Sequence, residues 1–201
     1  MEDSEKMAFI RTDEFKAIAS NLFKNEDGTD RFFLVDDRDG SVEDLQSAIE
    51  RLIISAGCKV IVIDVLQDVL DGLSNEEQAL FLKWAKSMIK SHGVLFIFIN
   101  HKRKSQNTGS KAVMMDEADI HGSSTIIKSA GMNILIGRDK MNDDPIIRNT
   151  TTIAVSKNRM TGLTGPAGAL YYENEKHKLH NFEKYFGMSY QDWLEKRAME
   201  K

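Results

Sequence analysis

The chain has 201 residues, of which 41% are hydrophobic and 29% are charged, and its formal net charge is −4. These values are those of an ordinary globular domain, and they exclude a uniformly basic nucleic-acid binder while leaving room for local basic loops. A single cysteine, Cys58, excludes an internal disulfide and a cysteine-rich zinc site, so we interpret it as a small core residue.

No apolar run is long enough to cross a bilayer, and Met1–Ser4 does not begin a signal peptide. We therefore expect a cytoplasmic protein without a membrane partner.

The N-terminal quarter of the chain predicts two helices and a short strand. The first helix is predicted by apolar residues at helical spacing: Phe15, Ile18, Ala19, Leu22 and Phe23. The run Phe32–Val35 predicts a strand, with a turn after it. Ser41 and Asp44 form a capping box, and the apolar stripe behind them predicts a second helix that ends at Gly57.

A strand with a polar end follows that helix. Val60–Ile63 consists of four β-branched residues, and Asp64 comes directly after them. This pattern is typical of a parallel strand that is covered on both faces and carries one carboxylate to the edge of a sheet. In open α/β sheets that edge is where ligands bind.

A second strand follows after one helix. Ser74 and Glu77 form another capping box, and the helix that they begin is expected to stop at Gly93. The apolar run Val94–Ile99 then predicts a strand that ends in Asn100 and His101. The order strand, helix, strand predicts a right-handed parallel crossover and hence an α/β fold.

The remaining half begins with a polar basic loop over 102–111. Further elements are predicted as a helix over 126–130, strands over 133–136 and 150–155, a β-hairpin formed by 170–173 and 178–182, and a short helix from Ser189.

Three segments resemble one family. Asp64-Val65-Leu66-Gln67 matches an Asp-x-x-Gln signature, and Lys157-Asn158-Arg159-Met160-Thr161-Gly162 matches Lys-x-Arg-x-Thr-Gly. Asp119–Ser124 is similar to Asp-Leu-Arg-Gly-Ser-Gly. The chain resembles the RecA-like ATPase domain of DnaB-type hexameric replicative helicases, most closely the helicase half of phage primase-helicases. The match runs in order from about Phe32 to Phe182.

The resemblance implies five catalytic residues. Asp64, the Walker B carboxylate, would hold Mg²⁺ opposite the phosphates of ATP or another NTP. Gln67 belongs to the same signature, and His101 would touch the γ-phosphate and relay its loss to a DNA loop. Lys157 and Arg159 would reach across a subunit interface, with Arg159 as a finger on the transferring phosphoryl group.

The resemblance also implies contacts with single-stranded DNA through two loops. The expected DNA-binding residues are Lys102, Arg103, Lys104, Lys111, His121, Gly122 and Ser123. The chain departs from the family pattern at His121, where an arginine is usual, and at Lys128, near the usual glutamine.

Several of these residues also have a purely structural interpretation. A buried strand followed by a carboxylate, such as Asp64, occurs in any doubly wound fold. Gln67 can be an ordinary surface residue, and His101 can simply end a strand. The basic loop can be solvated without binding anything.

No Gly-x-x-x-x-Gly-Lys-Ser/Thr phosphate loop occurs, and Gly109-Ser110-Lys111 has neither its spacing nor a preceding strand. We expect an N-terminal helical segment over 1–30, the C-terminal part of a helicase domain over 31–182 and a helical tail over 183–201. The phosphate-loop portion would come from another chain within a hexameric ring, in the bacterial host cytoplasm if the protein is phage-encoded. Two alternatives stay open: a non-catalytic module that binds DNA or a helicase, and an inactive split-gene fragment.

Overall fold

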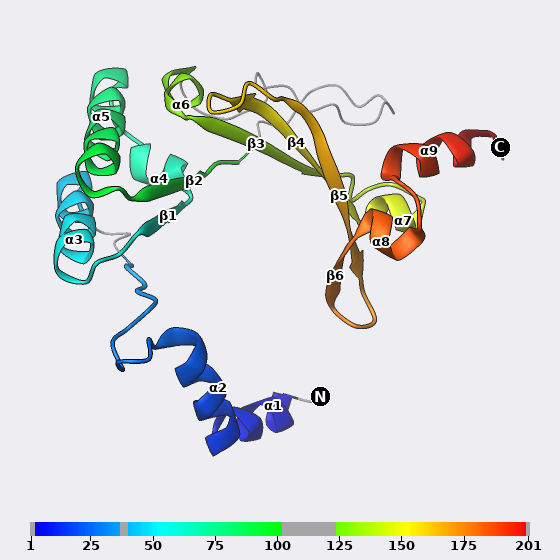
Figure 1. Ribbon diagram of the computed structural model, residues 1–201, viewed down its shortest axis with the longest axis horizontal. Helices are drawn as coiled ribbons and strands as arrows, with labels where there is room; N and C mark the ends of the chain where they lie inside the picture. The colour runs from blue at the N-terminus through cyan, green and yellow to red at the C-terminus, as the bar shows by residue number, and fades with distance from the viewer. Residues whose placement is uncertain (1–2, 37–39, 102–123, 200–201) are drawn as a thin grey trace. The chain divides into compact units, whose positions relative to one another are not determined.

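The computed structural model describes residues 3–36, 40–101 and 124–199 (Figure 1). These residues form two compact units, Met1–Ala56 and Gly57–Lys201, which are described separately. The boundaries predicted at residues 30 and 182 stay predictions. No helix in the described part of the chain is long and apolar enough to span a membrane.

The first unit contains three helices, α1 (Asp3–Ile10), α2 (Asp13–Phe23) and α3 (Val42–Ser55). The hydroxyl of Thr12 accepts a hydrogen bond from the Phe15 amide at the start of α2. The capping box predicted at Ser41 and Asp44 begins α3, because each side chain accepts a hydrogen bond from the other residue's backbone. Two isoleucines of α3, Ile49 and Ile53, are buried.

The strand predicted at Phe32–Val35 is wrong. These residues form no ladder with any described strand, and their side chains are exposed, up to 85% for Leu34. An apolar run becomes a strand only when a neighbouring strand satisfies its backbone N–H and C=O groups. Composition alone therefore could not decide the structure of this segment.

The second unit begins with a parallel strand pair joined by helices. The elements are β1 (Val60–Asp64), α4 (Leu66–Leu70), α5 (Asn75–His92) and β2 (Leu95–Ile99). Val60 pairs with Leu95, and the register continues without a break to Asp64 opposite Ile99. The predicted strand–helix–strand order is confirmed.

The ends of α5 follow the predicted signals. Ser74 and Glu77 cap its N-terminus, and Gly93 ends it in the left-handed region with φ of 63°. The short helix α4 was not predicted.

One face of this parallel pair is packed against α5. The Trp84 ring meets Phe96 at a centroid distance of 5.8 Å, and Phe81 meets Phe98 at 6.5 Å. Phe81 is almost fully buried, as is Leu66 of α4. This aromatic layer fixes α5 on the sheet and so helps to position the C-terminal ends of β1 and β2.

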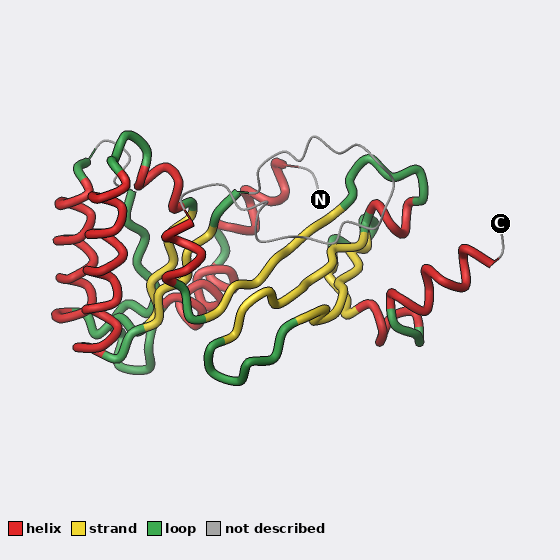
Figure 2. The backbone as a smooth tube through the Cα atoms, turned by 90° about the horizontal axis from the view of Figure 1, so that it is seen from above, coloured by secondary structure: helices red, strands yellow, loops and turns green. Residues whose placement is uncertain are grey.

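The rest of the unit is built on an antiparallel sheet with the order β3-β4-β5-β6. Its strands are β3 (Met132–Arg138), β4 (Thr150–Asn158), β5 (Gly165–Glu173) and β6 (Lys178–Asn181). The strands predicted in β3 and β4 and the hairpin of β5 and β6 are confirmed. Figure 2 shows these strands side by side, and Figure 1 places helix α6 (Ser124–Ser129) at one end of the sheet.

Two β-bulges interrupt the ladders of this sheet. Asn133 pairs with Lys157 but Ile134 pairs with Val155, so Ser156 is the extra residue in β4. In β5, Ala167 is extra, because Ile153 and Ala154 of β4 pair with Gly168 and Pro166. A bulge twists a strand locally and redirects the side chains beyond it.

Three short helices lie at the other end of the sheet (Figure 1): α7 (Pro145–Arg148), α8 (Phe182–Phe186) and α9 (Tyr190–Met199). The helix predicted from Ser189 is confirmed as α9. The Asn181 side chain accepts a hydrogen bond from the Lys184 amide and starts α8, so the last predicted strand ends one residue early.

A hydrophobic core joins these helices to the sheet. Its buried members are Ala169, Phe182 and Trp193, surrounded by partly buried apolar side chains. The Phe182 ring contacts Phe186 at 4.4 Å and lies edge-on to Trp193 at 6.1 Å. The C-terminal end of the unit thus has a core of its own.

Candidate functional site

Asp64 occupies the C-terminal end of β1, as predicted, with its side chain exposed. Strand alternation puts it on the same face of the sheet as Val60 and Val62. Among the described residues no group of three or more His, Cys, Asp or Glu side chains could hold a metal ion. One exposed carboxylate nevertheless suits Mg²⁺, which keeps several waters and takes one or two carboxylates together with substrate phosphates. Asp64 therefore fits a Mg²⁺ site whose other ligands would be water and the phosphates of a nucleotide.

Gln67 and His101 are joined by a two-point contact. The Gln67 side chain donates from Nε2 to the His101 carbonyl at 3.2 Å, and its Oε1 accepts from the His101 amide at 3.2 Å. A side-chain amide thus pairs with a peptide group as a neighbouring strand would. This contact links the first turn of α4 to His101, two residues beyond the end of β2, and the structure brings these two predicted site residues together.

The end of β2 holds one further polar group that is not satisfied. The Asn100 Oδ1 atom is buried and has no hydrogen-bond partner among the described residues. The imidazole of His101, the next residue, belongs to an exposed side chain. The Gln67 contact therefore holds the His101 backbone and leaves its ring accessible.

Lys157 and Arg159 meet at the C-terminal end of α6. The Lys157 ammonium donates to the carbonyls of Ile127 and Lys128 at 3.0 and 2.9 Å. Arg159 donates from Nη2 to the same Lys128 carbonyl at 2.9 Å, and its backbone amide donates to Gly131 at 2.9 Å. The structure brings these two predicted residues together as well.

Both cations are placed where they stabilise a helix end. The last carbonyls of a helix lack intrahelical donors and carry a partial negative charge, which a lysine or arginine offsets. Lys157 pairs with Asn133 directly after the bulge at Ser156, and Arg159 follows two residues later, just beyond the end of β4. The Ser156 Oγ atom is buried without a hydrogen-bond partner among the described residues.

The two pairs bond to different elements: Gln67 bonds to His101 beyond β2, and Lys157 and Arg159 bond to α6. The predicted DNA-binding residues, Lys102, Arg103, Lys104, Lys111, His121, Gly122 and Ser123, lie outside the described part of the chain.

Sequence reasoning missed two features of these sites. The first is that α6 receives Lys157 and Arg159; no local signal could reveal this, because the partners are about thirty residues apart. The second is the buried side-chain amide of Asn100, which lacks a partner for Oδ1 among the described residues. Its place directly after an apolar strand could have indicated a functional residue.

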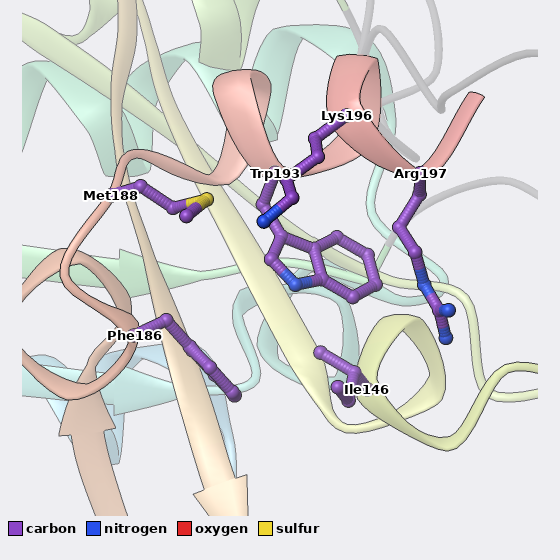
Figure 3. A pocket seen from close by; sticks show the side chains of 6 residues that line it. All are labelled: Ile146, Phe186, Met188, Trp193, Lys196 and Arg197. Atoms are coloured by element: carbon purple, nitrogen blue, oxygen red, sulfur yellow. The ribbon is translucent and has the colours of Figure 1, made fainter. Parts of the chain in front are cut away.

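A surface pocket lies elsewhere, among the C-terminal helices (Figure 3). It is lined by Ile146, Phe186, Met188, Trp193, Lys196 and Arg197. Arg197 lies over the Trp193 ring at 5.3 Å and bonds the Asp144 carboxylate at 2.8 Å. Burial raises the pKa of Asp144, but hydrogen bonds from the Ile146 amide and Arg197 outweigh it, so the net pKa is below the usual value. None of the predicted site residues lines this pocket.

Comparison with solved structures finds the same fold. The chain is similar to the ATPase domain of G40P, with a TM-score of 0.54 and 20% identity over 71% of this chain and 52% of that one. It is similar to a DnaB-like replicative helicase, from a structure that describes its interactions with primase, with a TM-score of 0.54 and 20% identity over 71% of this chain and 35% of that one. No protein-family model and no curated protein matches the sequence.

The predicted fold class is therefore confirmed: a RecA-like parallel sheet with flanking helices and a C-terminal β-hairpin. The chain spans about half the length of the G40P domain and about a third of the DnaB-like helicase.

Proposed function

We propose that this chain is part of a replicative ring DNA helicase that couples hydrolysis of ATP, or another NTP, to translocation on single-stranded DNA and duplex unwinding. Its phosphate loop is supplied by a polypeptide segment outside these 201 residues, and the assembled unit is one subunit of a homo-oligomeric ring, a hexamer by resemblance. The observation that carries the proposal is the two-point contact of Gln67 with His101 within a RecA-like fold.

That contact supports a phosphate-sensing role. Asp64 ends β1 and His101 lies two residues beyond the end of β2, the adjacent parallel strand, and ligands bind at this edge of open α/β sheets. The two hydrogen bonds from Gln67 fix the position of the His101 backbone, while the exposed imidazole stays able to contact a phosphoryl oxygen. A displacement of His101 is then transmitted to α4 and to the chain that follows His101, which contains the proposed DNA-binding residues.

Asp64 supplies the charge that this chemistry needs from the chain. Its carboxylate would hold Mg²⁺ directly or through water, and the bound metal neutralises charge on the phosphates. The sequence has no Gly-x-x-x-x-Gly-Lys-Ser/Thr motif, the pattern whose backbone amides cradle the β- and γ-phosphates. The chain alone is therefore expected to bind nucleotide poorly and to hydrolyse none.

Arg159 fits the finger role because, among the residues that the structure describes, its guanidinium donates one hydrogen bond, from Nη2 to the Lys128 carbonyl. Its fork presents five N–H donors in all, enough to engage phosphoryl oxygens of a neighbouring site. A finger that acts on the adjacent subunit also needs no contact with Asp64 of its own chain.

The test is reconstitution of ATPase activity. The chain, a polypeptide carrying the phosphate loop, and their mixture are each assayed for steady-state ATP hydrolysis with and without single-stranded DNA. We expect turnover only in the mixture, stimulated by DNA and abolished by Asp64→Asn. Asp68→Asn, an exposed carboxylate one turn later, is the matched control and should leave turnover unchanged. Turnover by the chain alone that Asp64→Asn removes would contradict the proposal.

A further inference from the structure

The pocket among the C-terminal helices combines an apolar lining with a basic rim. Its volume is about 340 Å³, and Phe186, Met188 and Trp193 form much of its apolar surface. Lys196 and Arg197 complete the rim from the last turn of α9, next to the Trp193 ring (Figure 3). None of the proposed catalytic residues lines this pocket, so its occupant is a separate question from the proposed function.

The walls of the pocket are held in place without a ligand. The Asp144 carboxylate accepts a hydrogen bond from the Ile146 amide at 2.8 Å, at the start of α7, and another from Arg197 of α9 at 2.8 Å. The Trp193 ring lies edge-on to Phe182 at 6.1 Å, and Arg197 lies over it at 5.3 Å. A pocket that is formed before binding needs little ordering when it is filled.

The size of the pocket limits what can enter it. A volume of about 340 Å³ lies near the lower end of the range of about 300–1,000 Å³ that is typical of small-ligand pockets. It can take one large apolar side chain with its adjoining backbone. A whole helix, about 10–12 Å across with its side chains, would not fit. A macromolecular partner would therefore insert a single residue.

The basic rim has donors to spare. In the part of the chain that the structure describes, Lys196 has no ion-pair partner, and Arg197 uses one of its five N–H donors, on Asp144. The acidic side chains of α9, Asp192 and Glu195, are hydrogen-bonded to residues one turn earlier in the chain. The Arg197 side chain is also 49% exposed. The rim can therefore receive an anion.

The apolar and basic groups are spaced for a charge that sits beside an apolar group. Trp193, Lys196 and Arg197 are three and four positions apart on α9, so they share one face of the helix, with Cβ atoms about 5–6 Å apart. At the carboxyl terminus of a peptide, the last side chain and the α-carboxylate leave the same Cα atom. A carboxylate also matches the planar fork of an arginine. A peptide terminus thus presents both groups at the required spacing.

A nucleic acid fits this pocket less well. Single strands bind by stacking their bases on open aromatic faces. The Trp193 side chain belongs to a residue that is only 9% exposed, and Tyr190 is stacked with it at a centroid distance of 6.3 Å. Little of the indole surface is therefore open to a base, whereas the pocket beside it is open to a side chain.

We infer that this pocket binds the carboxyl terminus of an acidic partner peptide whose last residue is large and apolar. The last side chain enters the space between Phe186, Met188 and Trp193, and the α-carboxylate accepts hydrogen bonds from Lys196 and Arg197. Acidic residues before the terminus add an attraction to the rim that salt screens. The inference goes beyond the proposed function, because this binding needs neither nucleotide nor DNA.

The test is a titration of the full chain into a labelled peptide. The probe is a fluorescein-labelled peptide of several aspartates that ends in phenylalanine with a free carboxylate, and fluorescence anisotropy measures its affinity. Two control peptides carry a terminal amide or end in serine. The NMR signal of the Met188 methyl group reports whether the peptide is in the pocket. Met141, which is 91% exposed and lies outside the pocket lining, is the reference signal.

We expect saturable binding that shifts the Met188 signal and leaves the Met141 signal in place. The terminal amide should weaken binding by about tenfold or more, because it removes the charge that the rim recognises. Lys196→Met, which keeps the apolar stem, should weaken it by about fivefold. Lys178→Met, which removes an exposed lysine of β6, is the matched control and should leave affinity unchanged. Urea denaturation should show equal stability for both variants.

Several results would overturn the inference. Equal affinity for the amidated peptide, or unchanged affinity in Lys196→Met, would mean that the rim does not hold the carboxylate. Binding without a shift of Met188 would place the peptide elsewhere. A neutral detergent that binds Met188 as tightly as the peptide would show an unselective apolar hole, and a thymidine oligonucleotide that displaces the peptide would identify a nucleic-acid site. A Met188 signal that depends on the concentration of the chain alone would mean that a second copy covers the pocket.

Discussion

The parallel and antiparallel sheets of the second unit differ in how far other elements of the chain cover their apolar side chains. The antiparallel sheet is closed at its C-terminal end by α8 and α9 around Phe182 and Trp193. The parallel pair is packed on one face only and leaves the other to solvent. The two candidate pairs are held differently as well, Gln67 on a backbone amide and Lys157 and Arg159 on helix carbonyls. The two candidate pairs therefore lie in regions that differ in how completely their apolar side chains are covered.

The largest effect is expected from the antiparallel side. Arg159→Ala should lower kcat of the reconstituted ATPase by about a thousandfold or more, because a finger stabilises charge mainly in the transition state. Nucleotide affinity should stay nearly unchanged, as measured by equilibrium binding. Arg159→Lys, which keeps the charge but not the fork, should recover little. An equal loss of binding and turnover would instead identify a structural arginine that only caps α6.

The difference in packing can be measured directly by paired truncations. Phe182→Ala should lower the free energy of unfolding by about 3–5 kcal/mol, because it empties a buried aromatic site. Val62→Ala, on the face of β1 that points away from α5, should change it by no more than about 0.5 kcal/mol, as expected for an exposed side chain. Urea denaturation followed by tryptophan fluorescence measures both. Similar losses of unfolding free energy would mean that the side chains at positions 62 and 182 are equally well packed.

A smaller effect is expected where the parallel strands end. Gln67→Ala removes both hydrogen bonds to His101, and at about 1 kcal/mol each it should speed exchange of the His101 amide by about tenfold or more. Gln78→Ala, which removes a side-chain hydrogen bond to the Leu73 carbonyl, is the control and should leave that amide unchanged. Equal exchange rates in Gln67→Ala and the unaltered chain would show that β2 alone holds His101.

The smallest effect concerns the ion pair at the C-terminal helices. The pKa of Asp144 is depressed in the folded chain, so its contribution is present above its unfolded pKa of about 3.9 and is lost as pH falls through the lower folded value. Because Arg197 is half exposed, Arg197→Met should cost at most about 1 kcal/mol at pH 7.

That difference should shrink below about pH 4, leaving only the contribution of Arg197 over the Trp193 ring, which does not titrate there. Denaturation at pH 7 and pH 3 measures both values. A difference that grows toward low pH would contradict the assigned ion pair.

The parts that were predictable from the sequence are those fixed by neighbours along the chain. Ser41 and Ser74 start helices through residues three positions away, and Gly93 ends one through its own backbone angle. The β1–α5–β2 order, and Asp64 and His101 at its ends, followed from the same local patterns. For these elements periodicity and capping contain nearly all the information.

The parts that could not be predicted depend on partners far away in the chain. Phe32–Val35 has the composition of a strand but pairs with no strand in the described part of the chain. Phe182 continued an apolar pattern, and only the Asn181 cap converts that point into a helix. The positions of Lys157 and Arg159 against α6 depend on how β4 pairs with β3, which no local pattern encodes.

The bulge at Ser156 makes this position tolerant of a change in chain length. Asn133 pairs with Lys157 and Ile134 pairs with Val155, so deleting Ser156 would leave both pairs in place and restore a regular ladder with Lys157 on the same face. Deleting Asn158 instead would break the alternation between Lys157 and Arg159 and turn Arg159 away from α6. Among homologous genes, sequences able to keep this site are expected to vary by one residue between Val155 and Lys157, but not between Lys157 and Arg159.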